Sequence, residues 1–458
     1  MASQDLVTDI ACSVEAALSA AKKSDTSRLE DILAKAEQAE GLSLEEAAFL
    51  LSIDNEELLE PVYRAAAKVK DLVFGPRVVL FAPLYLSNYC SNDCLYCGFR
   101  RSNEKARRKA LTLDEAVEQA RILSASGFKR ILLVAGEHNT HSGVDYLTEA
   151  AEAIYSKTDI RILHVNCAPL ETADFRRLKS AGYGVYQCFQ ETYHRETYAK
   201  MHPTGRKKDY DFRLSAMDRA LEAGFGDVGL GALLGLYDHR YDVLSTIAHS
   251  QHIEESFGAA AHTISVPRLR PAEGAILTTP KYPVSDSEFK KIVAVYRLSV
   301  PYAGVVVTTR EPEALREEVL DIGASQISAG SSTEPGGYGK GVHNTAQFDT
   351  NDVRELSKMM EVIARRGLLP SLCTSCYRSG RQGRAFLDVA SSGAMKDFCT
   401  PNALLSLKEY ILDSAGEDKK KALEDTLKRF VSSVGEPMKS DLMRKLSMIE
   451  KGGRDIHY

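Results

Sequence analysis

From about residue 75 the chain alternates between short apolar runs and longer stretches in which apolar residues recur every three or four positions. The short runs are typical of buried parallel strands, and the longer pattern is typical of amphipathic helices. The strands predicted in this way are Val78–Leu84, Ile131–Ala135, Ile162–Ala168, Val185–Phe189, Val228–Leu236, Thr263–Pro267, Val305–Thr309 and Gln326–Ala329. The clearest predicted helices between them are Leu113–Gly127, Leu147–Ser156, Phe175–Gly182 and Ala216–Gly224. This alternation favours an α/β fold, a (β/α)₈ TIM barrel, over a doubly wound open sheet.

Helical patterns flank the predicted barrel on both sides. Before it, Leu44 to Leu51 has helical periodicity, and Ser43 three residues ahead of Glu46 resembles a capping box. After residue 350 come further helices around a Gly-, Cys- and Arg-rich stretch. We therefore predict an N-terminal helical extension over 1–74, the barrel over 75–345 and a mainly helical C-terminal domain over 346–458.

The composition narrows the class of protein. With 458 residues, 44% hydrophobic and 26% charged, the chain is ordinary globular protein. It has no run of eighteen apolar residues and no signal-peptide pattern at its start, so we expect no membrane span and no secretion. The formal net charge is −5 without a long basic stripe, so we expect neither a nucleic acid nor a membrane as a partner.

The nine cysteines are the most informative residues in the composition. Nine is an odd number and too few for a disulfide scaffold in a chain of this length. Cys12, Cys167 and Cys188 have no neighbour at a useful spacing, whereas the other six fall into two tight groups. Grouped cysteines indicate metal binding, and thiolate-bound metal predicts a cytoplasmic, anaerobic protein.

The first group, Cys90, Cys94 and Cys97, follows the first predicted strand with the spacing C-x₃-C-x₂-C. Three thiolates can ligate three corners of a [4Fe–4S] cluster and leave one iron open. A structural zinc site is the alternative, but zinc requires a fourth ligand. The position fits a barrel enzyme, because barrel active sites lie at the carboxyl ends of the strands.

This spacing, with the aromatic Tyr96 before the third cysteine, resembles the radical S-adenosylmethionine (SAM) enzymes. The resemblance implies that SAM chelates the open iron and is cleaved to a 5′-deoxyadenosyl radical. It also implies a SAM-binding role for residues at later strand ends. These are Gly136 and Glu137 of an Ala-Gly-Glu motif, the polar pair Gln190 and Glu191, and Arg213 as partner of the SAM carboxylate.

The second group, Cys373, Cys376 and Cys399, has the spacing C-x₂-C-x₂₂-C in the C-terminal domain. Zinc completed by a histidine is one interpretation. The other is a second iron–sulfur cluster, again one ligand short. The stretch between the cysteines is rich in glycine and arginine, and cationic and backbone donors stabilise an anionic cluster.

A barrel of this kind followed by C-x₂-C-x₂₂-C resembles the HydG-type tyrosine lyases, which mature [FeFe]-hydrogenases. The resemblance covers most of the chain and includes His262-Thr-Ile-Ser-Val-Pro-Arg-Leu-Arg-Pro271, Cys373-Thr-Ser-Cys-Tyr-Arg378 and Cys399-Thr-Pro-Asn-Ala403. It implies cleavage of L-tyrosine to p-cresol and dehydroglycine in the barrel. It further implies conversion of dehydroglycine to CO and cyanide at an auxiliary [4Fe–4S] cluster extended by a fifth iron, with His262 as a ligand of that iron.

The resemblance also implies a substrate site and partners. Arg310, in a Thr-Arg-Glu sequence after the seventh predicted strand, is the candidate for the tyrosine carboxylate. Ser328 and Ser331, after the eighth, are candidates for further hydrogen bonds. The implied partners are a low-potential electron donor and a hydrogenase-assembly scaffold protein.

Two features keep other functions open. The chain departs from the HydG pattern after its third cysteine, at Cys97-Gly-Phe-Arg-Arg-Ser-Asn103, which leaves room for a paralogue with another role. The barrel half also resembles ThiH, the 2-iminoacetate synthase of thiamine synthesis, which lacks the C-terminal cysteines. A non-catalytic iron–sulfur carrier is the alternative from another class, and the SAM-type motifs at the strand ends argue against it.

Overall fold

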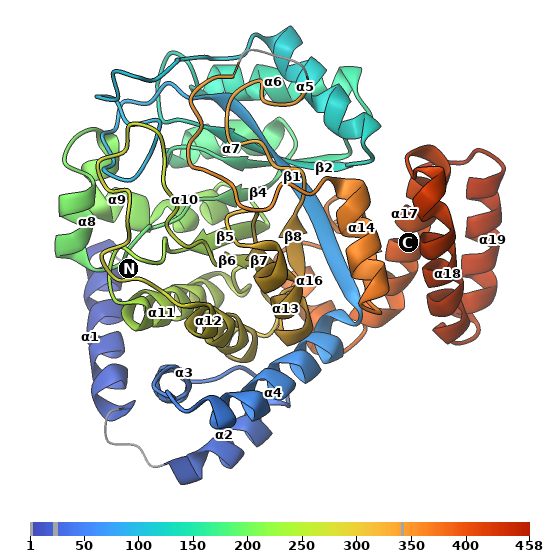
Figure 1. Ribbon diagram of the computed structural model, residues 1–458, viewed down its shortest axis with the longest axis horizontal. Coiled ribbons are helices and arrows are strands. Elements are labelled where there is room, and N and C mark those ends of the chain that lie inside the picture. Colours follow the sequence, from blue (N-terminus) through green and yellow to red (C-terminus); the bar gives the residue numbers. More distant parts are fainter. Residues whose placement is uncertain (1–2, 22–25, 340–342) are drawn as a thin grey trace.

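The computed structural model describes residues 3–21, 26–339 and 343–458. Eight parallel strands form a closed barrel, because β1 pairs with both β2 and β8, and helices surround it (Figure 1). The barrel strands are β1 (Arg77–Ser87), β2 (Arg130–Ala135), β3 (Ile162–Asn166), β4 (Tyr183–Gln187), β5 (Asp227–Gly231), β6 (Thr263–Ser265), β7 (Gly304–Val307) and β8 (Gln326–Ser328). The predicted (β/α)₈ barrel is confirmed, with every strand in its expected place along the chain.

The helices between the strands follow from local sequence signals. Thr112 and Ser285 each form a capping box with a glutamate three residues later, which fixes the starts of α5 and α12. The helices around the barrel are α5 (Leu113–Ala125), α6 (Val144–Lys157), α7 (Thr172–Ser180), α8 (Arg195–Met201), α9 (Tyr210–Leu214), α10 (Ala216–Glu222), α11 (His239–Phe257), α12 (Asp286–Ser299) and α13 (Glu313–Ile322).

Each predicted strand has at least one bound that differs from the structure, by one to three residues except at the end of the fifth strand. The fifth strand ends at Gly231, although the apolar run continues to Leu236. Beyond Gly231, Ala232 and Leu234 form only isolated bridges, to Glu191 and Arg268, and Leu233 lines a cavity. Gly235 then has a positive φ of 111°. The fourth strand ends at Gln187, two residues before the predicted end, and Cys188 and Phe189 are buried beyond it or face that cavity.

The N-terminal helices cover one side of the barrel. They are α1 (Ser3–Ala21), α2 (Leu29–Ala36), α3 (Leu44–Leu51) and α4 (Glu56–Phe74). Ser43 and Glu46 form the predicted capping box of α3. Helix α1 packs on α11 and α4 packs on α12, so their apolar faces extend the core outward from the barrel helices.

The C-terminal segment attaches where the barrel strands begin. After α14 (Leu356–Arg365), a short ninth strand, β9 (Leu369–Ser371), pairs in parallel with β1 from Arg77 to Val79. The sequence pattern did not predict this strand. The remaining helices are α15 (Ser375–Arg378), α16 (Arg384–Ser391), α17 (Met395–Asp413), α18 (Glu417–Ser433) and α19 (Met438–Glu450), and α17, α18 and α19 stand together beside the barrel (Figure 1).

The long strand β1 therefore connects two ends of the molecule (Figure 1). Its first residue, Arg77, lies beside β9, and its last residue, Ser87, leads directly to Cys90. At about 3.3 Å per residue the strand spans roughly 33 Å. The first cysteine group thus follows the last residue of β1, and the second group lies near its first residue.

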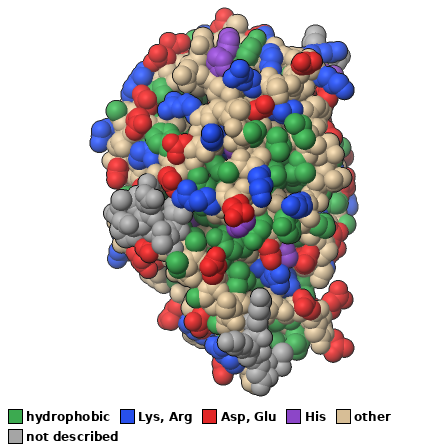
Figure 2. Space-filling view, turned by 90° about the vertical axis from the view of Figure 1, so that its left-hand side faces the viewer, with side chains coloured by type: hydrophobic (Ala, Val, Ile, Leu, Met, Phe, Trp, Pro, Cys, Tyr) green, Lys and Arg blue, Asp and Glu red, His purple; other side chains and the backbone are tan. Residues whose placement is uncertain are grey.

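The outer surface carries charges of both signs. Figure 2 shows one face, on which Lys and Arg side chains alternate with Asp and Glu around a central area of hydrophobic side chains. Among the described helices, none is long and apolar enough to cross a membrane.

Candidate active site and auxiliary cysteine site

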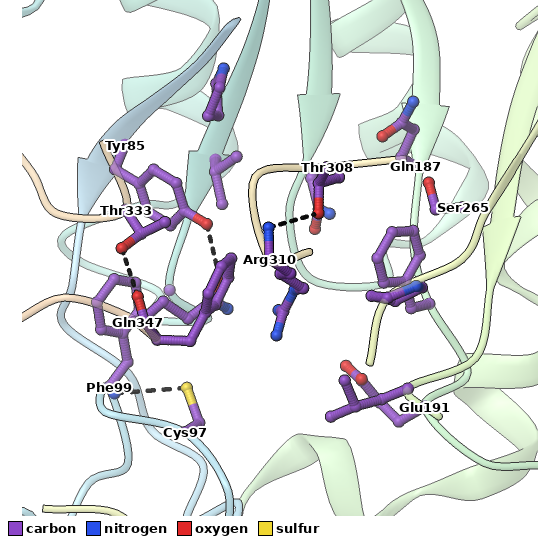
Figure 3. A pocket seen from close by; sticks show the side chains of 18 of the residues that line it. Tyr85, Cys97, Phe99, Gln187, Glu191, Ser265, Thr308, Arg310, Thr333 and Gln347 are labelled. Atoms are coloured by element: carbon purple, nitrogen blue, oxygen red, sulfur yellow. Dashed lines mark hydrogen bonds between the residues drawn. The ribbon is translucent and has the colours of Figure 1, made fainter. Parts of the chain in front are cut away.

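A cavity of about 1350 Å³, counting its open mouth, lies at the carboxyl ends of the barrel strands. The strand-end loops bring together residues that are far apart in the sequence (Figure 3). Of the residues predicted for the barrel site, the cavity lining includes Cys90, Cys94, Tyr96, Cys97, Gly136, Glu137, Glu191, Arg213, Arg310, Ser328 and Ser331.

The first cysteine group sits in a tightly packed loop. Burial raises the pKa of Cys90, of Cys94 and of Cys97, that of Cys97 to about 12. The Phe99 amide donates a hydrogen bond to Cys97 Sγ over 3.4 Å. Buried thiols with such pKa values ionise by binding metal, which replaces the proton, and a donor to sulfur is typical of iron–sulfur sites.

Gly136 permits the close approach of two strand-end loops. A Cβ at this position would lie 2.4 Å from the carbonyl oxygen of Tyr89, the residue before Cys90. The Gly136 amide donates to the Ser87 carbonyl at 2.8 Å. Any larger residue at position 136 would push the second strand-end loop away from the cysteines.

Glu137 and Arg213 form an ion pair at the cavity wall. Arg213 Nη1 lies 2.9 Å from Glu137 Oε1, and Asn92 donates to Glu137 Oε2 at 2.6 Å. Burial acts to raise the pKa of Glu137, but the charges of Arg213 and Lys207 and the hydrogen bonds from Arg213 and Asn92 together outweigh burial, so the pKa is lowered. The Arg213 Nε also donates to the Phe189 carbonyl at 2.8 Å. Both side chains are therefore held charged and in place.

Two cavity residues were missed in the sequence. Lys207 Nζ donates to Glu191 Oε1 at 2.6 Å, and Glu191 has a positive φ of 71°. Asn92 accepts the Lys207 amide on its side-chain oxygen at 2.9 Å. Asn92 could have been found in the sequence, because it lies inside the cysteine motif. Lys207 lies in a short basic run, a pattern that is typical of an exposed surface.

Tyr96 is fixed by a histidine outside the motif. Its hydroxyl lies 2.8 Å from Nε2 of His202, which is fully buried after α8. Gln190, by contrast, does not line the cavity. It is 3% exposed, and its Nε2 has no hydrogen-bond partner among the described residues.

Arg310 extends into the middle of the cavity, between Cys97 on one side and Glu191 on the other (Figure 3). Its guanidinium stacks on Phe348 with 3.3 Å to the ring centre. The neighbouring acid Glu311 pairs instead with Arg268 at 2.5 Å. Among the described residues no carboxylate forms an ion pair with Arg310, so the cavity holds a cation available to an anionic ligand.

The two predicted serines differ in their bonding. Ser328 Oγ accepts the Thr309 amide at 3.2 Å, so it also supports the loop that carries Arg310. Ser331 Oγ is buried in the cavity wall without a hydrogen-bond partner among the described residues. An unsatisfied buried hydroxyl facing a cavity is suited to bind a polar ligand group.

The second cysteine group lies beside the first residue of β1. The pKa of Cys399 is lowered to about 6 because Cys376 donates a hydrogen bond to it, and the nearby Arg77 guanidinium acts in the same direction. The Ser375 amide donates to Cys373 Sγ at 3.4 Å. The site therefore favours a thiolate at Cys399, whereas the pKa of its hydrogen-bond donor Cys376 is raised. It also offers donors to sulfur, as iron–sulfur ligation requires.

No group of three His, Cys, Asp or Glu side chains in the described ranges is close enough to share one metal ion. A tetrahedral zinc site needs such a group. In a [4Fe–4S] cluster each cysteine binds its own iron, so the ligands stand further apart. For the second cysteine group, zinc and a cluster therefore stay the two interpretations that the sequence gives.

His262 faces the second cysteine group from the start of β6. Its Nε2 lies 2.9 Å from the hydroxyl of Tyr377, the residue after Cys376. Its Nδ1 lies 3.5 Å from Asp227 Oδ1 but has no hydrogen-bond partner among the described residues. Burial lowers the pKa of His262, which keeps the ring neutral, the form that binds metal.

Other polar atoms around His262 are also unsatisfied. Within the described part of the chain, His164 Nδ1, Asp227 Oδ2 and Thr374 Oγ1 are buried without a hydrogen-bond partner. Native structures rarely leave such atoms unpaired, so a cluster here indicates a site for an ion or polar group. The thiol donors and these atoms together fit an auxiliary cluster at the lower end of the barrel.

The chain is similar to known proteins over the barrel and over the C-terminal segment that carries the second cysteine group. The radical SAM superfamily model matches residues 84–248, and the biotin and thiamin synthesis associated domain matches 265–369. The crystal structure of HydG, a maturase of the [FeFe]-hydrogenase, is 44% identical with a TM-score of 0.94, covering 97% of this chain and 98% of that one. HydG from Carboxydothermus hydrogenoformans is 39% identical with a TM-score of 0.86, covering 97% and 100%.

A second group of relatives matches a smaller part of this chain than the HydG structures do. The 2-iminoacetate synthase of Escherichia coli is 34% identical over 339 residues, which is 73% of this chain and 88% of that protein. Both family models end before Cys373, whereas the HydG structures cover nearly the whole chain. The resemblance inferred from the cysteine spacing is thereby confirmed. The protein is a radical SAM enzyme and belongs to the family that HydG shares with the 2-iminoacetate synthases.

Proposed function

We propose that the protein is a HydG-type tyrosine lyase that makes CO and cyanide for the assembly of [FeFe]-hydrogenase. The observation that supports this proposal is the second cysteine group, with His262 beside it, at the opposite end of the barrel from the first. A lyase that stopped at dehydroglycine would have no need of this second site. The 44% identity to HydG over 97% of the chain supports the same reading.

The upper cavity provides the features that tyrosine cleavage needs. Arg310 would bind the tyrosine carboxylate, with Ser331 and Ser328 adding hydrogen bonds, and Arg213, Glu137 and Glu191 would hold SAM beside the cysteines. When bound and reduced, the cluster and SAM supply a 5′-deoxyadenosyl radical that takes a hydrogen atom from the tyrosine amino group.

The reaction proposed here balances in two parts. Tyrosine, C₉H₁₁NO₃, gives p-cresol, C₇H₈O, and dehydroglycine, C₂H₃NO₂. The hydrogen atom that leaves with 5′-deoxyadenosine is replaced by one electron from the low-potential donor and one proton. Dehydroglycine gives CO, HCN and water at the auxiliary site. Dehydroglycine is an imine that water hydrolyses, so a protected route between the sites is useful.

We place that route through the barrel interior. Gln187 lines the floor of the upper cavity, and its Nε2 lies 3.5 Å from Thr263 Oγ1. Thr263 is the residue after His262, which faces the auxiliary site. Gln187 and Thr263 thus connect the lining of the upper cavity with the residue next to His262.

The test is product analysis with labelled tyrosine. Anaerobically reconstituted protein with SAM, dithionite and uniformly ¹³C-labelled tyrosine should form p-cresol together with labelled CO and cyanide. Cys399→Ser should retain p-cresol and lose CO and cyanide. Cys12→Ser, at an exposed cysteine far from both groups in sequence, is the matched control and should keep all three products.

A 2-iminoacetate synthase is the second candidate, because those relatives are up to 34% identical. It would release p-cresol and glyoxylate, the hydrolysis product of dehydroglycine, without CO from the wild-type protein. Absence of p-cresol as well would reject both lyases. Equal loss of p-cresol and CO in Cys399→Ser would contradict the division of labour between the two sites.

A further inference from the structure

The loop that follows the first cysteine group is unusually rich in cations. Between Gly98 and Lys109 it contains six basic residues and one acidic residue, Glu104. Arg100 pairs with Asp93 at 3.0 Å and Lys109 pairs with Glu115 at 2.6 Å. In contrast, the exposed cations have no ion-pair partner among the described residues; they are Arg101, Lys105 and Arg107.

A second basic segment lies against the same loop. Asn92, between Cys90 and Cys94, accepts the Arg101 amide on its carbonyl at 2.8 Å and the Lys207 amide on its side chain at 2.9 Å. Arg206 and Lys208, on either side of Lys207, are exposed and form no ion pair with a described carboxylate. Both sides of the cysteine loop therefore carry unpaired positive charge.

A large apolar side chain is exposed at the same place. Ile276 is 61% exposed, and its amide donates to the Leu95 carbonyl, within the cysteine motif, at 2.8 Å. Asn103 joins the two loops by donating to the Glu273 carbonyl at 2.9 Å. A single exposed apolar residue is ordinary on a protein surface, so the unpaired positive charge around Ile276 is what marks this area as a docking surface.

We propose that this surface, formed by Ile276 with Arg101, Lys105, Arg107, Arg206 and Lys208, docks a small acidic protein that carries one low-potential electron. The inference rests on the proposed function, which requires a reduced cluster. One electron leaves the docked carrier and enters the site at Cys90, Cys94 and Cys97, so the carrier is oxidised and the site reduced by one electron each. The cysteine loop backbone is then the short path between them.

The positive charge of this surface favours an acidic carrier protein. The three segments of this surface carry five exposed cations and three exposed acids, which are Glu104, Asp209 and Glu273. The surplus of positive charge favours an anionic partner. Complementary charge mainly accelerates encounter, by about 10- to 1,000-fold at low salt. A chain with a formal net charge of −5 would otherwise repel an acidic carrier, so the local positive surface has a specific use.

The experiment compares two reductants on the anaerobically reconstituted protein. A reduced [4Fe–4S] ferredoxin and a reduced flavodoxin, both of net negative charge, should drive formation of 5′-deoxyadenosine from SAM. In Arg101→Glu/Lys105→Glu and in Arg206→Glu/Lys208→Glu, the second-order rate constant with either carrier should fall about 10-fold or more at low salt. The difference should shrink to about twofold near 0.5 M salt, because charges are then screened within about 4 Å.

Dithionite and a distant variant serve as controls. Dithionite is small and needs no docking, so both variants should cleave SAM at the wild-type rate with it. Lys421→Glu/Lys428→Glu, at exposed cations of α18, should behave as wild type with every reductant. Ile276→Ser should weaken carrier binding without changing its salt dependence.

Several outcomes would overturn the inference. They are unchanged carrier kinetics in both charge-reversed variants, a parallel loss with dithionite, and a surface that binds RNA in a salt-dependent way while carrier kinetics stay normal. Failure of the wild-type protein to cleave SAM with dithionite is a different result, because it rejects the proposed function itself.

Discussion

The hydroxyl of Tyr377 lies 2.9 Å from Nε2 of His262, and this contact joins the cysteine-bearing C-terminal segment to the start of β6. When the histidine donates from Nε2 to the tyrosine oxygen, its Nδ1 is left with a free lone pair. Nδ1 is the ring nitrogen without a hydrogen-bond partner among the described residues. Histidines that bind metal usually use one nitrogen as ligand and fix the other by a hydrogen bond. The pair thus has the arrangement of a metal ligand and its support.

We predict that His262→Ala loses the extra iron and keeps the auxiliary [4Fe–4S] cluster. Alanine removes the nitrogen ligand but leaves all three cysteines in place. Iron analysis and the electron paramagnetic resonance signal of the extra iron measure the result, and p-cresol formation should continue. An unchanged signal would show that another residue is the ligand.

Tyr377→Phe tests the support and leaves the ligand in place. Loss of a hydrogen bond to a metal-bound histidine typically costs about 10- to 100-fold in metal affinity. We therefore expect the extra iron to bind that much more weakly while p-cresol formation stays normal. Titration with ferrous iron, followed by the same signal, gives the affinity. Phenylalanine fills the same space, and wild-type affinity in this variant would contradict the supporting role.

The cysteine groups could be predicted because their spacing is local. Three thiols within eight residues, as in Cys90 to Cys97, must lie close together in almost any fold. Lys207 and Tyr377 could not be found in this way. Lys207 reaches Glu191 only because a glycine turn packs its segment against Asn92, and Tyr377 meets His262 only because the C-terminal segment returns to the barrel.

In the fold, too, features set by local sequence could be predicted, and features set by contacts between distant segments could not. The barrel follows from the repeat of apolar runs and amphipathic helices, which is a property of sequence alone. Strand β9 was missed because Leu369, Pro370 and Ser371 show no strand pattern, and they pair only where β1 extends below the barrel. Whether Gln190 acts near SAM stays a prediction, since its side chain is buried outside the cavity lining.

Arg310→Gln should weaken tyrosine binding without affecting SAM. A charge-assisted hydrogen bond contributes about 1.5–3 kcal/mol, so kcat/KM for tyrosine should fall roughly 10- to 150-fold. Burial lowers the pKa of Arg310, yet an arginine stays protonated near neutral pH. Arg270→Gln is the control, because Arg270 also lines the cavity but donates to Asn351.

The readouts for this pair are p-cresol kinetics and SAM binding by equilibrium dialysis. Loss of SAM binding in Arg310→Gln would assign the residue to the cofactor instead. An equal rise of KM in Arg270→Gln would show that the cavity does not single out Arg310 for the tyrosine carboxylate.

The ion pair between Arg316 and Asp352 gives a prediction about stability. Both side chains are fully buried, and Arg316 also donates to the Ser328 carbonyl at the end of β8. Asp352→Asn leaves a buried guanidinium without its carboxylate, a change that typically costs about 3–5 kcal/mol. The midpoint of chemical unfolding, followed anaerobically, should fall accordingly. Asp349→Asn, at an exposed carboxylate nearby in the chain, is the control and should have little effect.

The pH dependence of that difference follows from the pKa of Asp352. Burial acts to raise it, but the hydrogen bond from Arg354 and the charge of Arg316 outweigh burial, so the pKa is lowered below 3.8. A carboxyl with a lowered folded-state pKa stabilises the protein fully above its unfolded pKa, near 4, and loses this contribution as pH falls through the folded-state value. The gap between wild type and Asp352→Asn should therefore stay constant from about pH 8 to about pH 5. A gap that closes within this range would mean that Asp352 is not held as a carboxylate by the two arginines.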